Sequence, residues 1–245
     1  MARVVIFGAT SAIAQAVARI WASRGCAMVL AGRDGNRLEA IGRDLRARGA
    51  ERVTTHVLDA LDTPRHEEFV DRAFEYLELP DIVLIAHGTL PDHARARRDP
   101  QAVADALAVN GASACALAAA FAARLEPARH GTVAVISSVA GDRGRASNYV
   151  YGAAKGTVDR FLEGLSASLR DTGVRIVNVK PGFVDTPMTA GFSKNALFAT
   201  PEGIAPAIVD AIERGARVAY VPWFWGPIMA VLRAVPRFVF ERLPI

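Results

Sequence analysis

The sequence contains very little cysteine. Only two of its 245 residues, Cys26 and Cys115, are cysteines, and both lie in apolar surroundings without partner spacing. This excludes a disulfide-stapled fold and a zinc site built from paired cysteines, because both need several closely spaced thiols. The five histidines have no ligand spacing either, so we expect no metal site. The thiols are expected to be small core residues in a reducing compartment.

Long apolar segments are also missing. No uninterrupted apolar run reaches the roughly 18 residues that a membrane-spanning helix needs. The first residues, Met-Ala-Arg-Val-Val-Ile-Phe-Gly, lead directly into a strand pattern and leave no room for a signal peptide. We therefore expect a cytoplasmic protein without a spanning helix.

Acidic residues are fewer than basic ones. The 25 Asp and Glu residues face 29 Lys and Arg residues, which gives a net charge of +4. No basic strand with interleaved aromatics and no recognition helix is present, so a nucleic-acid partner is not expected. The basic excess suits a phosphorylated substrate, a nucleotide cofactor or an anionic membrane surface, and a merely solvated surface accounts for it equally well.

What the sequence does contain is a regular alternation of strand and helix patterns. Hydrophobic residues make up 51% of the chain, enough for one large core, and no break in composition indicates a second domain. The alternation predicts one α/β domain with a doubly wound parallel sheet of about seven strands and helices on both faces. The expected strands are 4–7, 28–31, 53–57, 82–86, 133–137, 174–179 and 218–221, and the expected helices include 12–23, 36–48, 66–78, 100–125 and 149–170.

Three residues that follow the fifth expected strand form a candidate catalytic group. Tyr151 and Lys155 are four positions apart, so a helix places them on one face about one turn from each other. Ser138, at the end of the strand, can reach the same point. A nearby ammonium favours the phenolate form of a tyrosine, and a serine hydroxyl can hold the oxygen that gains or loses a proton. Tyr149 is a competing tyrosine, but it has Ala153 four positions on.

The turn after the first strand is a candidate phosphate site. It runs Gly8-Ala9-Thr10-Ser11-Ala12-Ile13-Ala14 and opens the first helix, whose free N–H groups can bind a pyrophosphate. Gly8, Thr10, Ser11 and Ile13 are the candidate cofactor contacts. A plain strand-to-helix connection is the alternative.

The ends of the second and third strands concern the identity of the cofactor. Gly32 and Arg33 stand where an NAD-binding unit has a carboxylate for the ribose, and a guanidinium suits a 2′-phosphate, so NADP(H) is favoured over NAD(H). Asp34, the next residue, keeps NAD open. Asp59 ends the third strand, where an aspartate can form the turn before the next helix.

These motifs together resemble the short-chain dehydrogenase/reductase family over residues 1–221. The spacing Ser138 to Tyr151-x-x-x-Lys155 is similar to the catalytic signature of that family, and Pro181-Gly182-x-Val184-x-Thr186 is similar to its nicotinamide-binding motif. Two motifs depart from the pattern: Ala12 and Ala14 replace glycines of the first turn, and 85–88 reads Ile-Ala-His-Gly where the family has Asn-Asn-Ala-Gly.

The resemblance implies a Rossmann-like fold and an NADP(H)-dependent interconversion of a carbonyl and a secondary alcohol. It implies that Tyr151 is the acid/base, that Ser138 steadies the substrate oxygen and that Lys155 lowers the pKa of Tyr151 and binds the ribose. Asn110, a polar residue inside an alanine-rich helix, would order a relay water, with a buried structural asparagine as the alternative. The implied cofactor contacts are Gly8, Thr10, Ser11, Ile13, Arg33, Asp59, Ala86, Gly88, Tyr151, Lys155, Pro181, Val184 and Thr186.

Two open points concern partners and activity. The family usually pairs through its long helices, here 100–125 and 149–170, which implies a homo-oligomer. Within enzymes, a general soluble carbonyl reductase or alcohol dehydrogenase is one reading. The altered glycine turn leaves a non-enzymatic NADP-binding sensor as an alternative, although a sensor needs no intact serine, tyrosine and lysine.

The segment 222–245 is expected to be an apolar and basic extension of the catalytic domain. Its tryptophans, phenylalanines and arginines fit a helix at a membrane interface, but also a tail packed over the domain or a neighbouring subunit. With Arg143 and Arg145 in the loop before Tyr151, the tail resembles the decaprenylphosphoryl-2-keto-pentose reductase branch of the family. That resemblance implies a keto-sugar on a polyprenyl phosphate, with both arginines at the substrate phosphate and the tail at the inner membrane face.

Overall fold

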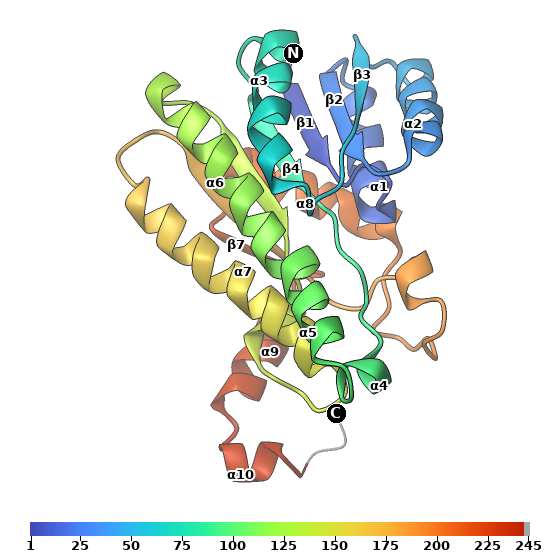
Figure 1. Ribbon diagram of the computed structural model, residues 1–245, viewed down its shortest axis with the longest axis vertical. Coiled ribbons are helices and arrows are strands. Elements are labelled where there is room, and N and C mark those ends of the chain that lie inside the picture. Colours follow the sequence, from blue (N-terminus) through green and yellow to red (C-terminus); the bar gives the residue numbers. More distant parts are fainter. Residues whose placement is uncertain (243–245) are drawn as a thin grey trace.

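A computed structural model describes residues 1–242, in which seven parallel strands form one sheet (Figure 1). The order of the strands is β3-β2-β1-β4-β5-β6-β7. The sequence predicted all seven, with ends that differ by up to two residues. Their bounds are β1 Arg3–Phe7, β2 Ala27–Gly32, β3 Val53–Val57, β4 Ile82–Ile85, β5 Thr132–Ile136, β6 Arg175–Pro181 and β7 Val218–Val221.

Two groups of helices cover the two faces of the sheet. One face packs against α1 (Ala12–Ala22), α2 (Gly35–Ala47) and α8 (Pro201–Arg214). The other packs against α3 (His66–Leu77), α6 (Ser113–Leu125) and α7 (Tyr149–Ser168). In Figure 1, α6 and α7 run side by side across the sheet. The predicted doubly wound architecture is confirmed.

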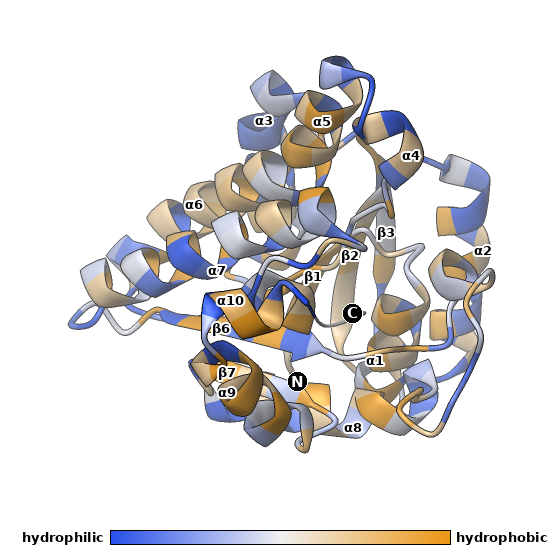
Figure 2. Ribbon diagram, turned by 90° about the horizontal axis from the view of Figure 1, so that it is seen from below, coloured by the Kyte–Doolittle hydropathy of each residue, from blue (hydrophilic) through white to orange (hydrophobic). Residues whose placement is uncertain are grey.

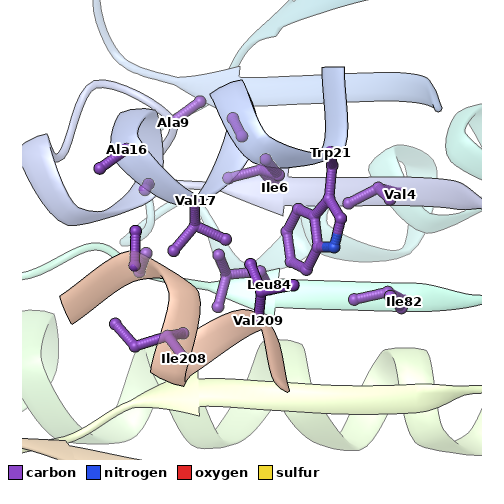
Figure 3. Packing of buried hydrophobic residues seen from close by; sticks show 14 of the residues in the cluster. Val4, Ile6, Ala9, Ala16, Val17, Trp21, Ile82, Leu84, Ile208 and Val209 are labelled. Atoms are coloured by element: carbon purple, nitrogen blue, oxygen red, sulfur yellow. The ribbon is translucent and has the colours of Figure 1, made fainter. Parts of the chain in front are cut away.

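The inner strands are apolar on both faces because both faces are covered. Every residue of β2, β4 and β5 is buried. Figure 3 shows how Val17 and Trp21 of α1 meet Leu84 of β4 and Val209 of α8 in one cluster. Successive residues of each strand therefore pack into different clusters, one on each face of the sheet.

The strand order reverses between β1 and β4, and this reversal positions the site. Both strands point the same way, with Val4 opposite Ile82 and Phe7 opposite Ile85. The connection after β1 leads to one face of the sheet and the connection after β4 to the other. A crevice therefore opens beyond the carboxyl ends of the two strands, where ligands of such sheets bind.

The long helix predicted over 100–125 contains a π-helical turn. It divides into α5 (Pro100–Leu107), η2 (Ala108–Ala112) and α6. The run Pro100–Ala128 is long and apolar enough to cross a membrane by length and composition, but 56% of its most apolar window is buried within the protein. A core helix of an α/β protein has the same pattern, and the burial of Leu117 and Phe121 against the sheet places this helix in the core.

The C-terminal extension packs onto the domain. It forms α9 (Trp225–Ala234) and α10 (Arg237–Phe240), and its last three residues, 243–245, lie outside the described part of the chain. Trp225 and Met229 are buried against Val139. Figure 2 shows α9 next to β7, with hydrophobic residues on both. Residues 225–240 of the tail thus pack on the domain, which is one of the three placements that the sequence left open.

A buried ionic network ties the tail side of the sheet to the loop after β5. The Lys180 ammonium of β6 lies 2.7 Å from Asp159 of α7 and also contacts Asp142. The Tyr220 hydroxyl of β7 donates to Asp142 at 2.9 Å. All three charged side chains are at least 95% buried, so each depends on its partners for the solvation that water would give. This network holds η4 (Val139–Asp142) against β6 and α7.

Candidate active site

The crevice beyond β1 and β4 contains a cavity of about 360 Å³. Its wall includes every predicted catalytic residue except Asn110 and every predicted cofactor residue. The segments that supply the wall are far apart in the sequence, and the common end of the parallel strands brings them together. Four basic side chains and one acidic side chain line the cavity: Arg33, Arg37, Arg145, Lys155 and Asp59.

Ser138, Tyr151 and Lys155 lie next to one another in the lining of this cavity. The Lys155 ammonium donates to the Ile136 carbonyl at 2.9 Å and lies 5.9 Å from the centre of the Tyr151 ring. Lys155 is 3% exposed. Ser138 caps η4, because its hydroxyl accepts from Ala140 N–H at 3.1 Å. The four-residue spacing on α7 therefore brings tyrosine and lysine to one side of the helix, as predicted.

Burial determines the protonation states of the tyrosine and the lysine. Desolvation raises the pKa of Tyr151 to about 12, and the Ser138 side chain opposes this shift. Desolvation lowers the pKa of Lys155 to about 8, while the carboxylate of Asp159 acts in the opposite direction. Desolvation is thus the main influence on the pKa of Tyr151 in the protein itself, and the lowering of this pKa by Lys155 stays a prediction. At neutral pH the phenol keeps its proton.

Asn110 lies behind the cavity in the π-helical turn η2. Its Oδ1 accepts from Thr89 N–H at 2.8 Å, and its Nδ2 donates to the Ala106 carbonyl at 3.0 Å. A Cβ added to Gly88 would come 3.0 Å from Asn110 Oδ1 and 3.7 Å from Lys155 Nζ. The asparagine thus fixes the chain after β4 close to Lys155. Its role in a proton relay stays a prediction.

The turn after β1 fits a diphosphate in spite of its missing glycines. Gly8 has φ +80°, and a Cβ there would lie 2.4 Å from the backbone nitrogen of His87. Only glycine is compatible with both the backbone conformation and that close approach. The helix α1 begins at Ala12, and its Ser11 N-cap makes no side-chain cap bond, so N–H groups at this end are available to a ligand.

Two arginines line the cavity beside the end of β2. Arg33 lies in the connection between β2 and α2, Arg37 lies in the first turn of α2, and both are exposed. Arg37 was not predicted from the sequence, because no motif there singles it out. Asp34 caps α2 by accepting from Arg37 N–H at 3.0 Å. The Asp34 carboxylate therefore has a structural partner, and Arg33 and Arg37 are the two cations of the described lining on this side.

Asp59 and His87 complete that side of the cavity. Asp59 Oδ1 accepts a hydrogen bond from Leu61 N–H at 2.9 Å, so this aspartate forms a turn. It also lines the cavity. His87 Nε2 lies 2.9 Å from the Ser113 hydroxyl. Desolvation first and the Lys155 charge second lower the pKa of His87 to about 3, so its ring is neutral. His87 is therefore a structural residue of the cavity wall, between Ala86 and Gly88.

The opposite wall is formed after β6 by Pro181, Val184 and Thr186. The Val184 carbonyl accepts from the Thr189 hydroxyl at 2.6 Å, and a bridge from Val184 to Ala199 closes the loop. Met188 and Phe192, which the sequence analysis did not name, extend this wall and are more than 40% exposed. They give the cavity an apolar side next to Tyr151.

The two loop arginines separate in the structure. The Arg143 guanidinium donates to the Val235 carbonyl at 2.6 Å and to those of Leu232 and Arg233, and it lies 3.8 Å above the Phe240 ring. Arg143 does not line the cavity, so we no longer assign it to a substrate phosphate: it holds the carbonyl end of α9. Arg145 does line the cavity.

Among residues 1–242, no three His, Cys, Asp or Glu side chains are grouped so that they could hold a metal ion. The charged groups that line the cavity belong to the arginines, Lys155 and Asp59. The chemistry available there is proton transfer and the binding of anionic groups.

Known proteins resemble this chain along most of its length. The family model for short chain dehydrogenases matches residues 2–196. An uncharacterized oxidoreductase of Mycobacterium tuberculosis is 39% identical over 243 residues, which cover 99% of this chain and 97% of that protein. An uncharacterized oxidoreductase of Streptomyces coelicolor is 36% identical over 242 residues, which cover 98% of this chain and 95% of that protein.

Two solved structures share the fold. An alcohol dehydrogenase of Thermococcus sibiricus complexed with 5-hydroxy-NADP has a TM-score of 0.78 at 24% identity, with 90% of this chain and 94% of that chain covered. An actinorhodin polyketide ketoreductase with NADPH has a TM-score of 0.79 at 21% identity, with 90% and 95% covered. The chain therefore belongs to the short-chain dehydrogenase/reductase family of oxidoreductases.

Proposed function

We propose that this protein uses NADP(H) to interconvert a carbonyl and a secondary alcohol, with Tyr151 as the acid/base. The observation that supports this most is that Ser138, Tyr151 and a buried Lys155 line one cavity together. A sensor that only binds the cofactor has no use for a buried ammonium beside a phenol, and such a cation is costly to keep.

When bound, NADPH supplies the hydride that a carbonyl carbon receives. Tyr151 gives its proton to the carbonyl oxygen as the hydride arrives, so that the carbonyl becomes a hydroxyl and one proton is taken up from water. The Ser138 hydroxyl binds the same oxygen and stabilises its developing charge. Lys155 would hold the ribose hydroxyls of a bound cofactor and would serve as the source from which Tyr151 regains its proton. Tyr151, which carries its proton at neutral pH, acts as the acid in reduction, and the same groups serve the reverse oxidation with the proton moving the opposite way.

NADP(H) suits the cavity better than NAD(H). Two guanidinium groups, Arg33 and Arg37, face the end of β2, while the adjacent Asp34 carboxylate is engaged as a helix cap. A guanidinium binds a phosphate through charge-assisted hydrogen bonds, whereas a free carboxylate would repel it.

The substrate is proposed only in outline. The apolar wall of Met188 and Phe192 suits a hydrophobic carbonyl compound, and a keto-sugar carried on a polyprenyl phosphate combines such an apolar portion with an anionic group. A general ketone reductase is the second candidate, favoured by the same wall. Assembly through α5–α6 and α7, and a location in the cytoplasm, stay predictions.

The tail is proposed to touch an anionic membrane. Trp223 is 77% exposed and Phe238 is 67% exposed, and Phe238 follows Arg237 in a tail that also carries Arg233 and Arg242. Exposed aromatic and basic side chains together are typical of interfacial helices.

The tyrosine can be tested directly. Tyr151→Phe should lower the turnover number about 10³-fold, as expected when a general acid is lost, and leave NADPH affinity unchanged. Stopped-flow NADPH oxidation with a panel of ketones and keto-sugars measures the first, and NADPH fluorescence titration measures the second. Tyr149→Phe is the matched control, since Tyr149 does not line the cavity. Turnover retained by a pure Tyr151→Phe variant would refute the role of the phenol.

The buried lysine predicts a pH-dependent stability. The pKa of Lys155 in the folded protein, about 8, lies below the ordinary value of 10.5. Burying the charged ammonium therefore lowers the free energy of unfolding by its full amount below pH 8, and this destabilisation disappears as the pH rises toward 10.5. Relative to the wild type, Lys155→Met should therefore lose about 3 kcal/mol of unfolding free energy across that range. Urea unfolding at each pH measures it. The exposed change Lys194→Met should show no such trend, and equal pH profiles for Lys155→Met and the wild type would contradict the assignment.

Cofactor choice should depend on the two arginines beside the end of β2. The double change Arg33→Gln and Arg37→Gln should weaken NADPH binding about 100-fold, because two charge-assisted bonds to the 2′-phosphate are lost, with little effect on NADH. Fluorescence titration with both cofactors tests this. Arg43→Gln, an exposed change on the same helix, serves as the control. The NADP(H) preference is wrong if NADPH and NADH lose affinity equally.

Membrane contact can be measured by flotation with phosphatidylglycerol vesicles. Trp223→Ser with Phe238→Ser should abolish co-flotation without unfolding the domain, because both side chains are exposed, whereas removal of the tail would uncover Trp225 and Met229. Replacement of the exposed Val57 by Ser is the control. Absence of wild-type flotation would end the lipid proposal.

A further inference from the structure

Arg145 stands apart from the other charged side chains of the cavity. Its Nε is buried and has no hydrogen-bond partner, and within residues 1–242 no carboxylate lies within 4.0 Å of its guanidinium. Its neighbour Arg143 differs, because three main-chain carbonyls and an aromatic ring surround that guanidinium. A buried guanidinium nitrogen without a partner costs free energy that a ligand acceptor would recover.

The position of Arg145 is fixed relative to Tyr151. The Asn148 N–H donates to the Arg145 carbonyl at 3.2 Å, and the Gly152 N–H donates to the Asn148 carbonyl at 2.8 Å. These bonds join the loop that bears Arg145 to the first turn of α7, which carries Tyr151. The arginine thus belongs to the substrate end of the cavity, whereas Arg33 and Arg37 belong to the start of α2 at the other end.

We infer that Arg145 binds an oxyanion of the substrate, a carboxylate or a phosphate ester, and so selects anionic carbonyl compounds. That the ligand is a substrate rests on the proposed function, whereas that it is an anion rests on the unpaired guanidinium. A planar guanidinium offers two parallel N–H groups to either oxyanion, which matches the geometry of both. Burial also lowers the pKa of Arg145, a measure of how poorly its present surroundings solvate the cation.

The balance of charge supports an anionic ligand. Apart from Arg145 and Lys155, the lining residues near Tyr151 are apolar or neutral, and Asp59 at the far end is the single acid of the described lining. An anion entering near Tyr151 therefore meets two cations and no nearby carboxylate. In a site partly shielded from water, such an arrangement attracts negative charge more strongly than the same groups do at the surface.

Isothermal titration of the full chain with three small probes tests this without turnover. Benzoate and phenyl phosphate carry the two oxyanions, and benzamide is their neutral counterpart. Arg145→Gln should weaken binding of at least one anion about tenfold, the size expected for a charge-assisted hydrogen bond, and leave benzamide unchanged. Arg145→Lys should recover part of the affinity. Arg98→Gln, an exposed change outside the cavity, is the control.

The pattern of losses identifies the anion. If phenyl phosphate alone depends on Arg145, the substrate is a phosphate ester, and if benzoate alone does, it is a carboxylate. If phenyl phosphate binds at Arg33 and Arg37 instead, its affinity will fall in Arg33→Gln and stay unchanged in Arg145→Gln. Equal affinities of the wild type and Arg145→Gln for both anions would overturn the inference. Arg145-dependent binding in a protein that oxidises no NADPH would instead refute hydride transfer and leave the anion site standing.

Discussion

The buried ammonium of Lys155 is the constraint on which the rest of the site depends. A cation that is 3% exposed must find its solvation inside the protein, and the Ile136 carbonyl at the end of β5 supplies one bond at 2.9 Å. To reach that carbonyl, α7 must run close over the end of the sheet. This placement brings Tyr151, one turn earlier, to the mouth of the crevice, and the hydroxyl of Ser138 to its side.

A second layer of charges supports this position. Asp159, one turn after Lys155, receives hydrogen bonds from Ser137 at 2.7 Å and Asn178 at 2.8 Å and an ion pair from Lys180. Its negative charge raises the pKa of Lys155 against the effect of desolvation. The π-helical turn η2 also supports the position of α7. Its Gly111 lets η2 approach α7 closely, because a Cβ at this residue would lie 3.2 Å from the Ala154 carbonyl oxygen. Removal of one member of such a network would leave a buried charge unpaired.

The sequence predicts the fold well because the signals for it are local. Apolar runs such as 82–86 can only be buried strands in this pattern, and Gly8 marks a turn that no other residue could make. The pairing of Tyr151 with Lys155 follows from helical spacing alone. What the sequence could not show depends on distant contacts. Arg143 and Arg145 look alike in the sequence, and only the position of the tail separates them. The pKa of Tyr151 likewise depends on burial by residues from other segments, which no local motif reveals.

The cavity divides into two ends with different ligands, and the family assignment agrees with the first of them. The turn after β1, the arginines after β2 and the wall after β6 fit a dinucleotide, and Tyr151 stands where the dinucleotide would meet a substrate. Arg145 belongs to the second end, which is specific to the loop that precedes α7. This division explains how a common fold can keep one cofactor and change its substrate, because the loops vary while the strand ends do not.

The central claim is that Tyr151 and Lys155 face the reactive end of a bound nicotinamide cofactor. A crystal structure of the protein with NADPH tests it most directly. The account predicts the nicotinamide ring between Tyr151 and Val184, the ribose hydroxyls at roughly 2.7–3.2 Å from Lys155 Nζ, and the 2′-phosphate between Arg33 and Arg37. A nicotinamide bound outside this cavity, or a ribose beyond the reach of Lys155, would contradict it.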